Sequence, residues 1–156
     1  MKHKHKMAYL KSAEAFAECS VGERLRVGAI ITKAGGGSIA EGYNGLPTHM
    51  DGPLEDEDGV TKPEVRHAEK NALLKLTRSN ESSVGGTMFC THPCCVPCAV
   101  DIVDAGILEF YFKDFYRDLK GVKYLLEAGV KVFKYVDGKF CPVINLGGEN
   151  VSIQSK

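Results

Sequence analysis

Residues 87–112 have the sequence TMFCTHPCCVPCAVDIVDAGILEFYF. The apolar run from Thr87 to Thr91 predicts a buried strand, and a helix is expected over about 95–105, with Gly106 ending it. Residues 107–112 are again apolar and aromatic, which predicts a second strand. A strand, a helix and a strand in direct succession imply that the two strands pair in parallel through a right-handed crossover.

The sequence on both sides of this segment continues the alternation of helices and strands. Three glycines at 35–37 predict a turn between two antiparallel strands. The other expected elements are helices over 7–19, 66–78 and 119–128 and strands over 27–31, 38–44 and 130–136. We therefore expect an α/β fold, a three-layer α/β/α sandwich around a mixed sheet of about five strands. Residues 47–63 are expected to form a long acidic loop, and no element is predicted for the tail 137–156.

Length and charge narrow the class of protein. The chain has 156 residues, which favours a single domain over residues 1–156. Its 20 basic and 20 acidic side chains cancel, which argues against a nucleic-acid partner and favours a small molecule. The basic residues 1–6 are not followed by an apolar run, so we expect no signal peptide, no membrane partner and a cytoplasmic location. Four of the six cysteines lie within 90–98, which indicates metal binding and not a disulfide framework.

Two short motifs carry the chemistry, a His-x-Glu pair at His67 and Glu69 and a Cys-x-x-Cys pair at Cys95 and Cys98. Two thiolates and one imidazole suit Zn²⁺, and three protein ligands leave a fourth position for a water whose pKa the metal lowers to about 7. Glu69 beside that water is expected to shuttle protons, although an ordinary solvated helix residue is the alternative. Cys94 with Cys98 is a second possible ligand pair, but a spacing of two residues is the commoner one.

The position of these motifs agrees with a shared site. Pro63 indicates that the helix carrying His67 and Glu69 has only just begun there, so both side chains can reach a metal beyond the helix end. Cys95 and Cys98 lie at the start of the next helix, with Pro97 tolerated in its first turn. The positive end of that helix dipole favours thiolate. We therefore expect two helix starts to converge on one ion.

These motifs resemble those of the zinc-dependent cytidine deaminase superfamily. The likeness covers roughly residues 8–135 and is greatest to its deoxycytidylate deaminases. The segments that carry it are Arg26–Ile31, Gly42–Pro47, His67–Ala72, Thr91–His92 and Tyr116–Asp118. The sequence departs from the pattern at Cys94, which stands where the family has the proline before its first zinc cysteine, and Pro93 is one position early.

The resemblance implies an activity, the hydrolysis of deoxycytidine 5′-monophosphate (dCMP) to deoxyuridine 5′-monophosphate (dUMP), a precursor of thymidylate, and ammonia. It also implies substrate-binding residues. Asn44 corresponds to an asparagine that binds the sugar, and a turn-forming Asn-Gly is its ordinary alternative. The 5′-phosphate is expected to bind Arg26, Tyr116 and Arg117. The alternative for the arginines is solvated surface, where an isolated exposed arginine is more often found. His92 is the remaining expected substrate contact.

The resemblance further implies regulation. Gly42, Tyr43, Asn44 and Gly45 match a segment that binds nucleoside triphosphates, with dCTP activating and dTTP inhibiting, usually with Mg²⁺, and relatives are commonly hexamers. Tyr43 alternatively packs as a strand residue. Some relatives hold a second zinc, but only Cys19 and His49 are available for it here, and we see no complete ligand set.

Two rival functions remain at this stage. A tRNA or free-nucleobase deaminase shares the same zinc core, but the balanced charge and the run from Tyr43 to Pro47 argue against tRNA. A non-enzymatic zinc module is disfavoured by Glu69 and by the open coordination position.

Overall fold

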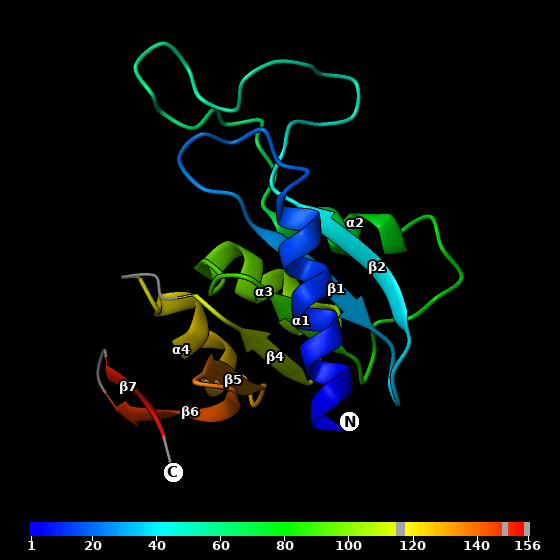
Figure 1. The fold of residues 1–156 in the computed structure, drawn as a ribbon, viewed down its shortest axis with the longest axis vertical. Helices are drawn as coiled ribbons and strands as arrows, with labels where there is room; N and C mark the ends of the chain where they lie inside the picture. Colours follow the sequence, from blue (N-terminus) through cyan, green and yellow to red (C-terminus); the bar gives the residue numbers. More distant parts are fainter. Residues whose placement is uncertain (115–117, 148–149, 155–156) are drawn as a thin grey trace.

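The computed structural model describes residues 1–114, 118–147 and 150–154. Helices and strands alternate along most of the chain, as Figure 1 shows. The elements are α1 (His3–Ala17), β1 (Gly28–Thr32), β2 (Ser38–Tyr43), α2 (Ala68–Leu76), β3 (Thr87–Cys90), α3 (Val96–Asp104), β4 (Glu109–Phe112), α4 (Lys120–Glu127), β5 (Lys131–Val136), β6 (Lys139–Gly147) and β7 (Asn150–Ile153). Every helix and strand expected from the sequence is present, with ends that differ by a few residues. None of the helices in the described part of the chain has the length and apolarity needed to cross a membrane.

The sheet is mixed, with the strand order β2-β1-β3-β4-β5-β6-β7. The central strands β3, β4 and β5 pair in parallel, which confirms the crossovers expected from the strand and helix succession. The hairpin β1–β2 joins β3 through antiparallel pairing. The sheet has seven strands and not about five, because the tail continues it as β6 and β7.

The two additional strands begin at a tight turn. Asp137 and Gly138 have positive φ angles of 45° and 84°, and this reverses the chain between β5 and β6. Pro142 lies inside β6, where pairing passes from β5 to β7. A proline in a run of this kind argues against a strand, so the sequence pattern underestimated this edge of the sheet.

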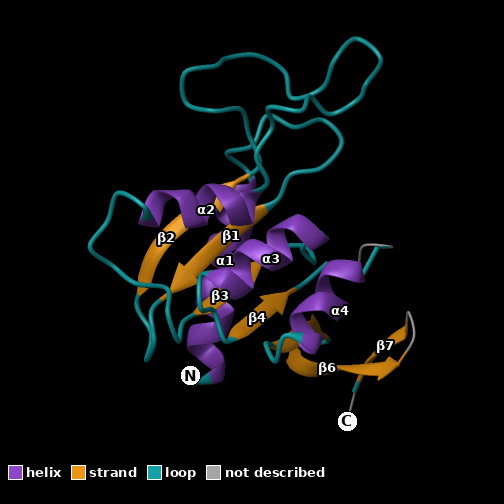
Figure 2. Ribbon diagram, turned by 180° about the vertical axis from the view of Figure 1, so that it is seen from behind, coloured by secondary structure: helices purple, strands orange, loops and turns teal. Residues whose placement is uncertain are grey.

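Helices cover the sheet on two faces and make three layers. On one face α1 packs against β1, β2 and β3. On the other face lie α2, α3 and α4, seen in front of the strands in Figure 2. The alternation along β3 produces the two faces, since Met88 and Cys90 belong to the core under α2–α4 and Phe89 to the core under α1. The expected three-layer architecture is confirmed.

Two glycines bring the helix starts close to their supports. A Cβ at Gly42 in β2 would lie 2.2 Å from the carbonyl oxygen of Ala68, at the beginning of α2. A Cβ at Gly121 in α4 would lie 2.1 Å from the carbonyl oxygen of Cys94, directly before α3. Because real Cβ contacts are never this short, only glycine permits this backbone packing. The starts of α2 and α3 are thereby held in place by neighbouring elements.

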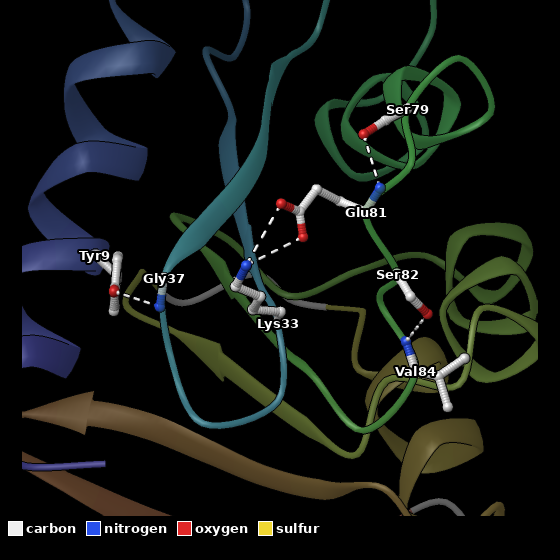
Figure 3. A network of polar contacts seen from close by, with 7 residues as sticks. All are labelled: Tyr9, Lys33, Gly37, Ser79, Glu81, Ser82 and Val84. Carbon is white, nitrogen blue, oxygen red and sulfur yellow. Dashed lines mark hydrogen bonds and ion pairs between the residues drawn. The ribbon is translucent and has the colours of Figure 1, made fainter.

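Polar contacts fix the opposite end of the hairpin, at the turn between β1 and β2 (Figure 3). The Gly37 amide donates to the hydroxyl of Tyr9 in α1 over 3.0 Å. Lys33 pairs with Glu81 at 3.2 Å, and exposed pairs of this kind contribute roughly 0.2–1 kcal/mol. Two short-range hydrogen bonds lie nearby: the Glu81 backbone amide donates to the Ser79 hydroxyl, and the Val84 backbone amide donates to the Ser82 hydroxyl. This end of the molecule therefore has an ordinary structural role.

Candidate metal centre and active site

The starts of α2 and α3 meet at one place and present three donor side chains. His67 caps α2 and Cys95 caps α3, both with extended backbone, while Cys98 lies in the first turn of α3. The Nδ1 atom of His67 lies 3.3 Å from Sγ of Cys95 and 3.5 Å from Sγ of Cys98. The expected convergence of two helix starts is confirmed.

This donor set fits zinc. The ligand atoms of His67, Cys95 and Cys98 all lie within 4.8 Å of one another, and no other such group of three is found in residues 1–114, 118–147 and 150–154. One imidazole and two thiolates are borderline-soft ligands, and three protein ligands leave a tetrahedral ion one position for water or substrate. Cys94 lies outside the group and is 1% exposed in the apolar core. The alternative pairing of Cys94 with Cys98 is therefore disfavoured.

Hydrogen bonds among the three donors shift their pKa values. The pKa of Cys95 is lowered to about 4, mainly by its hydrogen bond with Cys98 and further by His67. The pKa of Cys98 is raised by the same interaction with Cys95, and the pKa of His67 is raised by its bond to Cys95. A cation bound here displaces these protons, because only thiolate and neutral imidazole are metal ligands.

Glu69 lies in the first turn of α2, two residues after the donor His67. Its side chain is 4% exposed and lines the same cavity as His67 and Cys95. Burial raises the pKa of Glu69 to about 7. A carboxyl group with a pKa near neutrality both accepts and releases protons, as a general acid and base must.

A cavity of about 490 Å³ opens beside these residues. The hairpin side contributes Asn44, Val27 and neighbouring residues of the segment before β1. The acidic loop contributes Leu54, Glu55 and Thr61, and Val65 follows directly after the loop. His92, Pro93 and Cys94 form the wall between β3 and α3. The volume suits a small molecule of nucleotide size.

Asn44 and His92, both expected to contact substrate, line this cavity. The Asn44 amide accepts from the Val27 amide at 2.7 Å and donates to the Leu25 carbonyl at 2.9 Å. It therefore fixes the wall of the cavity through backbone groups. His92 Nδ1 lies 2.9 Å from the Thr91 hydroxyl, and burial lowers its pKa.

Of the three residues expected to bind the phosphate, Arg26 lies in the part of the chain that the structure describes. Arg26 bonds the Gly22 carbonyl at 3.2 Å and pairs with Glu18 at 3.7 Å, and it is not among the residues that line the cavity. Arg24, which the sequence analysis did not single out, does line it. Tyr116 and Arg117 lie outside the described residues. The role of all three expected residues stays a prediction.

The segment expected to bind effectors runs along α2. Gly42 allows the close approach to Ala68, and the Tyr43 carbonyl accepts from the Asn71 side chain at 2.8 Å. The backbone of Gly45 pairs with that of Arg66. These contacts give the segment a structural role, and effector binding there stays a prediction.

Two residues of the acidic loop are buried, which the sequence pattern did not indicate. Leu54 is 2% exposed and Glu55 is 9% exposed, and both line the cavity. The segment is a loop, as predicted, but Leu54 and Glu55 within it are buried and not solvated. The available signal was Leu54 itself, a large aliphatic residue directly before the acidic residues.

The family model for the cytidine and deoxycytidylate deaminase zinc-binding region matches residues 2–114, which include α1 to β4, the donor cluster and Glu69. The chain belongs to this family. Deoxycytidylate deaminase of Saccharomyces cerevisiae is 33% identical over 137 residues, which are 81% of this chain and 43% of the yeast protein. ComE operon protein 2 of Bacillus subtilis is 32% identical over 130 residues, 80% of this chain and 67% of that protein. The chain thus spans less than half the length of the yeast relative.

A solved structure supports the same assignment within the deaminase family. The crystal structure of dCMP deaminase from the cyanophage S-TIM5, in complex with dCMP and dUMP, matches with a TM-score of 0.83 at 43% sequence identity. The match covers 86% of this chain and 99% of the phage protein. The cytidine deaminase-like fold expected from the sequence is confirmed.

Replacing Cys98 by alanine is expected to remove bound zinc, because two donors hold the ion poorly against chelation. Metal analysis of Cys98→Ala should find less than about a tenth of the zinc per chain of the parent protein. Cys19→Ala removes an exposed thiol and is the matched control. Cys94→Ala is also expected to keep its zinc. Undiminished zinc in Cys98→Ala would contradict the ligand assignment.

Proposed function

We propose that the chain hydrolyses dCMP to dUMP and ammonia. The observation that carries the proposal is the placement of a buried carboxyl group, Glu69, in one cavity with the donor cluster of His67, Cys95 and Cys98. The likeness to a phage enzyme crystallised with dCMP and dUMP favours this substrate. The product is a precursor of thymidylate.

The metal and the protein have separate tasks in this reaction. His67, Cys95 and Cys98 would hold a Zn²⁺ ion, which would lower the pKa of a bound water to about 7 and stabilise developing negative charge. Glu69 takes a proton from the attacking water and transfers it to N3 of the cytosine ring while the new carbon–oxygen bond forms at C4. Glu69 then carries the second proton of the water to the amino nitrogen. The carbon–nitrogen bond breaks and ammonia leaves, so the atoms of one water are divided between dUMP and ammonia.

Further residues are proposed to hold the nucleotide in place for this transfer. Asn44, held by hydrogen bonds to Val27 and Leu25, lines the cavity and is proposed to bind the sugar. His92 lines the cavity next to Pro93 and Cys94 and is proposed as a further substrate contact. The 5′-phosphate is proposed to bind Arg26, Tyr116 and Arg117. Arg24 is an additional cation at the cavity and is compatible with the same anion.

Regulation belongs to the same proposal. We propose that dCTP activates and dTTP inhibits at a site that includes Gly42, Tyr43, Asn44 and Gly45, with Mg²⁺ accompanying the triphosphate, in a hexamer. Family likeness supports this, and Tyr43 at 36% exposure is accessible to a ligand. Kinetics with and without each triphosphate should show activation by dCTP and inhibition by dTTP. An enzyme indifferent to both would be unregulated at this segment.

The phosphate preference tests the substrate assignment. The parent protein is expected to favour dCMP over deoxycytidine by at least about a hundredfold in kcat/KM, because the nucleoside loses charge-assisted hydrogen bonds of about 1.5–3 kcal/mol each. Ammonia release from dCMP, dCTP, cytidine and deoxycytidine is measured side by side. Arg117→Ala should penalise dCMP far more than deoxycytidine, and Arg78→Ala, at an exposed arginine outside the cavity, is the control. Equal activity on the nucleotide and the nucleoside would place the protein with nucleoside deaminases.

The proton transfers assigned to Glu69 are tested by Glu69→Gln. The substitution keeps the shape of the side chain and removes the proton acceptor, so kcat should fall by about 10²–10⁴-fold. Zinc content and the thermal unfolding midpoint are measured on the same samples and are expected to stay near the parental values. Substantial turnover by a zinc-loaded Glu69→Gln protein would show that another group moves the protons.

A further inference from the structure

Glu55 is a buried acidic residue in the wall of the cavity, on the side formed by the acidic loop. Its side chain is 9% exposed, and its Oε2 atom is buried with no hydrogen-bond partner in the described part of the chain. The other oxygen, Oε1, accepts only a long bond of 3.5 Å from the Arg24 amide. No other side-chain nitrogen or oxygen among the described residues is buried and unpartnered in this way.

The backbone around Glu55 is fixed by contacts within the acidic loop. Glu55 pairs with Thr61 in an isolated antiparallel bridge, and the Lys62 amide donates to the Leu54 carbonyl at 2.9 Å. The side chain of Leu54 is 2% exposed, so it anchors the loop at this point. Glu55 is therefore fixed as a residue of the cavity wall by the fold of the loop.

An unpartnered carboxylate oxygen in a buried position is unfavourable, because it has lost its water and gained no donor. Buried polar atoms in folded proteins are nearly always paired, and an exception in a ligand cavity points to a donor that the ligand brings. The ligand group at Glu55 must therefore be a hydrogen-bond donor. A phosphate is excluded, since two anions repel each other.

This inference rests on the proposed function, which limits the donors available. Neutral dCMP groups that donate are the exocyclic amine and the 3′-hydroxyl of deoxyribose, because N3 and O2 of the ring only accept. The amine has to lie at Glu69 and the donor cluster, where it is released. Only the 3′-hydroxyl is left for Glu55.

We propose that Glu55 accepts a hydrogen bond from the 3′-hydroxyl of the substrate and selects nucleotides in which this hydroxyl is free. The contact holds the sugar at the loop side of the cavity and directs the negative 5′-phosphate away from the carboxylate. A nucleotide inside a strand carries a phosphodiester at this oxygen, which cannot donate and adds a negative charge. Glu55 thereby favours the free mononucleotide over a residue in a nucleic acid.

The hydroxyl is tested with 2′,3′-dideoxycytidine 5′-monophosphate, which lacks only the proposed donor. The zinc-loaded parent protein is expected to prefer dCMP by roughly tenfold to a hundredfold in kcat/KM, the range of one hydrogen bond to a charged acceptor. In Glu55→Ala the activity on dCMP should fall to the level of the dideoxy nucleotide, so that the ratio approaches one. Glu55→Gln keeps a neutral acceptor of the same size and should give an intermediate ratio, and it serves if the alanine variant does not fold.

Glu57→Gln is the matched control, because Glu57 is exposed in the same loop. This substitution should leave the ratio of kcat/KM for dCMP and the dideoxy nucleotide at the parental value. A binding measurement accompanies the kinetics. Calorimetry should find dUMP bound more tightly than its 2′,3′-dideoxy analogue by the parent and equally by Glu55→Ala. This readout does not depend on turnover.

The outcomes separate the two proposals. A parent protein that deaminates dCMP but treats the dideoxy nucleotide equally overturns the role of Glu55 alone. A Glu55 variant that slows both substrates by the same factor also overturns it and leaves Glu55 with a structural role. A zinc-loaded parent that releases no ammonia from dCMP overturns the proposed function and this inference with it.

Discussion

The rest of the structure depends on bringing one imidazole and two thiol groups from two separate segments within 4.8 Å of one another. The start of a helix is suited to metal binding, because its first side chains can reach a metal beyond the helix end and the helix dipole favours thiolate there. The parallel crossover from β3 through α3 to β4 places Cys95 and Cys98 at the carboxyl end of β3. The antiparallel hairpin β1–β2 supports α2 and thus His67. Gly42 and Gly121 allow the backbone contacts that hold both helix starts.

The same arrangement provides the chemistry beside the metal centre. Glu69 follows His67 by two residues in the first turn of α2, so one helix start positions both a proposed metal ligand and the proposed proton carrier. Burial raises the pKa of Glu69 to about 7, which is the range in which a carboxyl group transfers protons in both directions. The acidic loop adds Leu54 and Glu55 to the lining of the same cavity. The proposed zinc ligands and the proposed proton carrier thus come from the starts of α2 and α3, and the acidic loop adds part of the cavity wall.

The sequence predicted the parts of this site that depend on local patterns. His67, Cys95 and Cys98 were identified from ligand type and spacing, and their helix positions follow from nearby prolines and glycines. Contacts between distant segments were beyond such patterns. No strands were predicted in the tail because it contains glycines and its apolar pattern is weak, although pairing with β5 overrides that preference. Glu55 was grouped with solvated acids, since only the folded loop shows that one of its oxygens is buried without a partner. The cavity position of Arg24, next to the outward-facing Arg26, likewise depends on tertiary structure.

The central claim is that three side chains from two helix starts hold zinc and leave one position open. Zinc K-edge X-ray absorption of the purified protein measures the coordination shell directly. We predict two sulfur neighbours at about 2.3 Å and two nitrogen or oxygen neighbours at about 2.0–2.1 Å, from His67 and one water. A shell with three sulfur neighbours would place Cys94 in the site and close the open position, and this result would contradict the account.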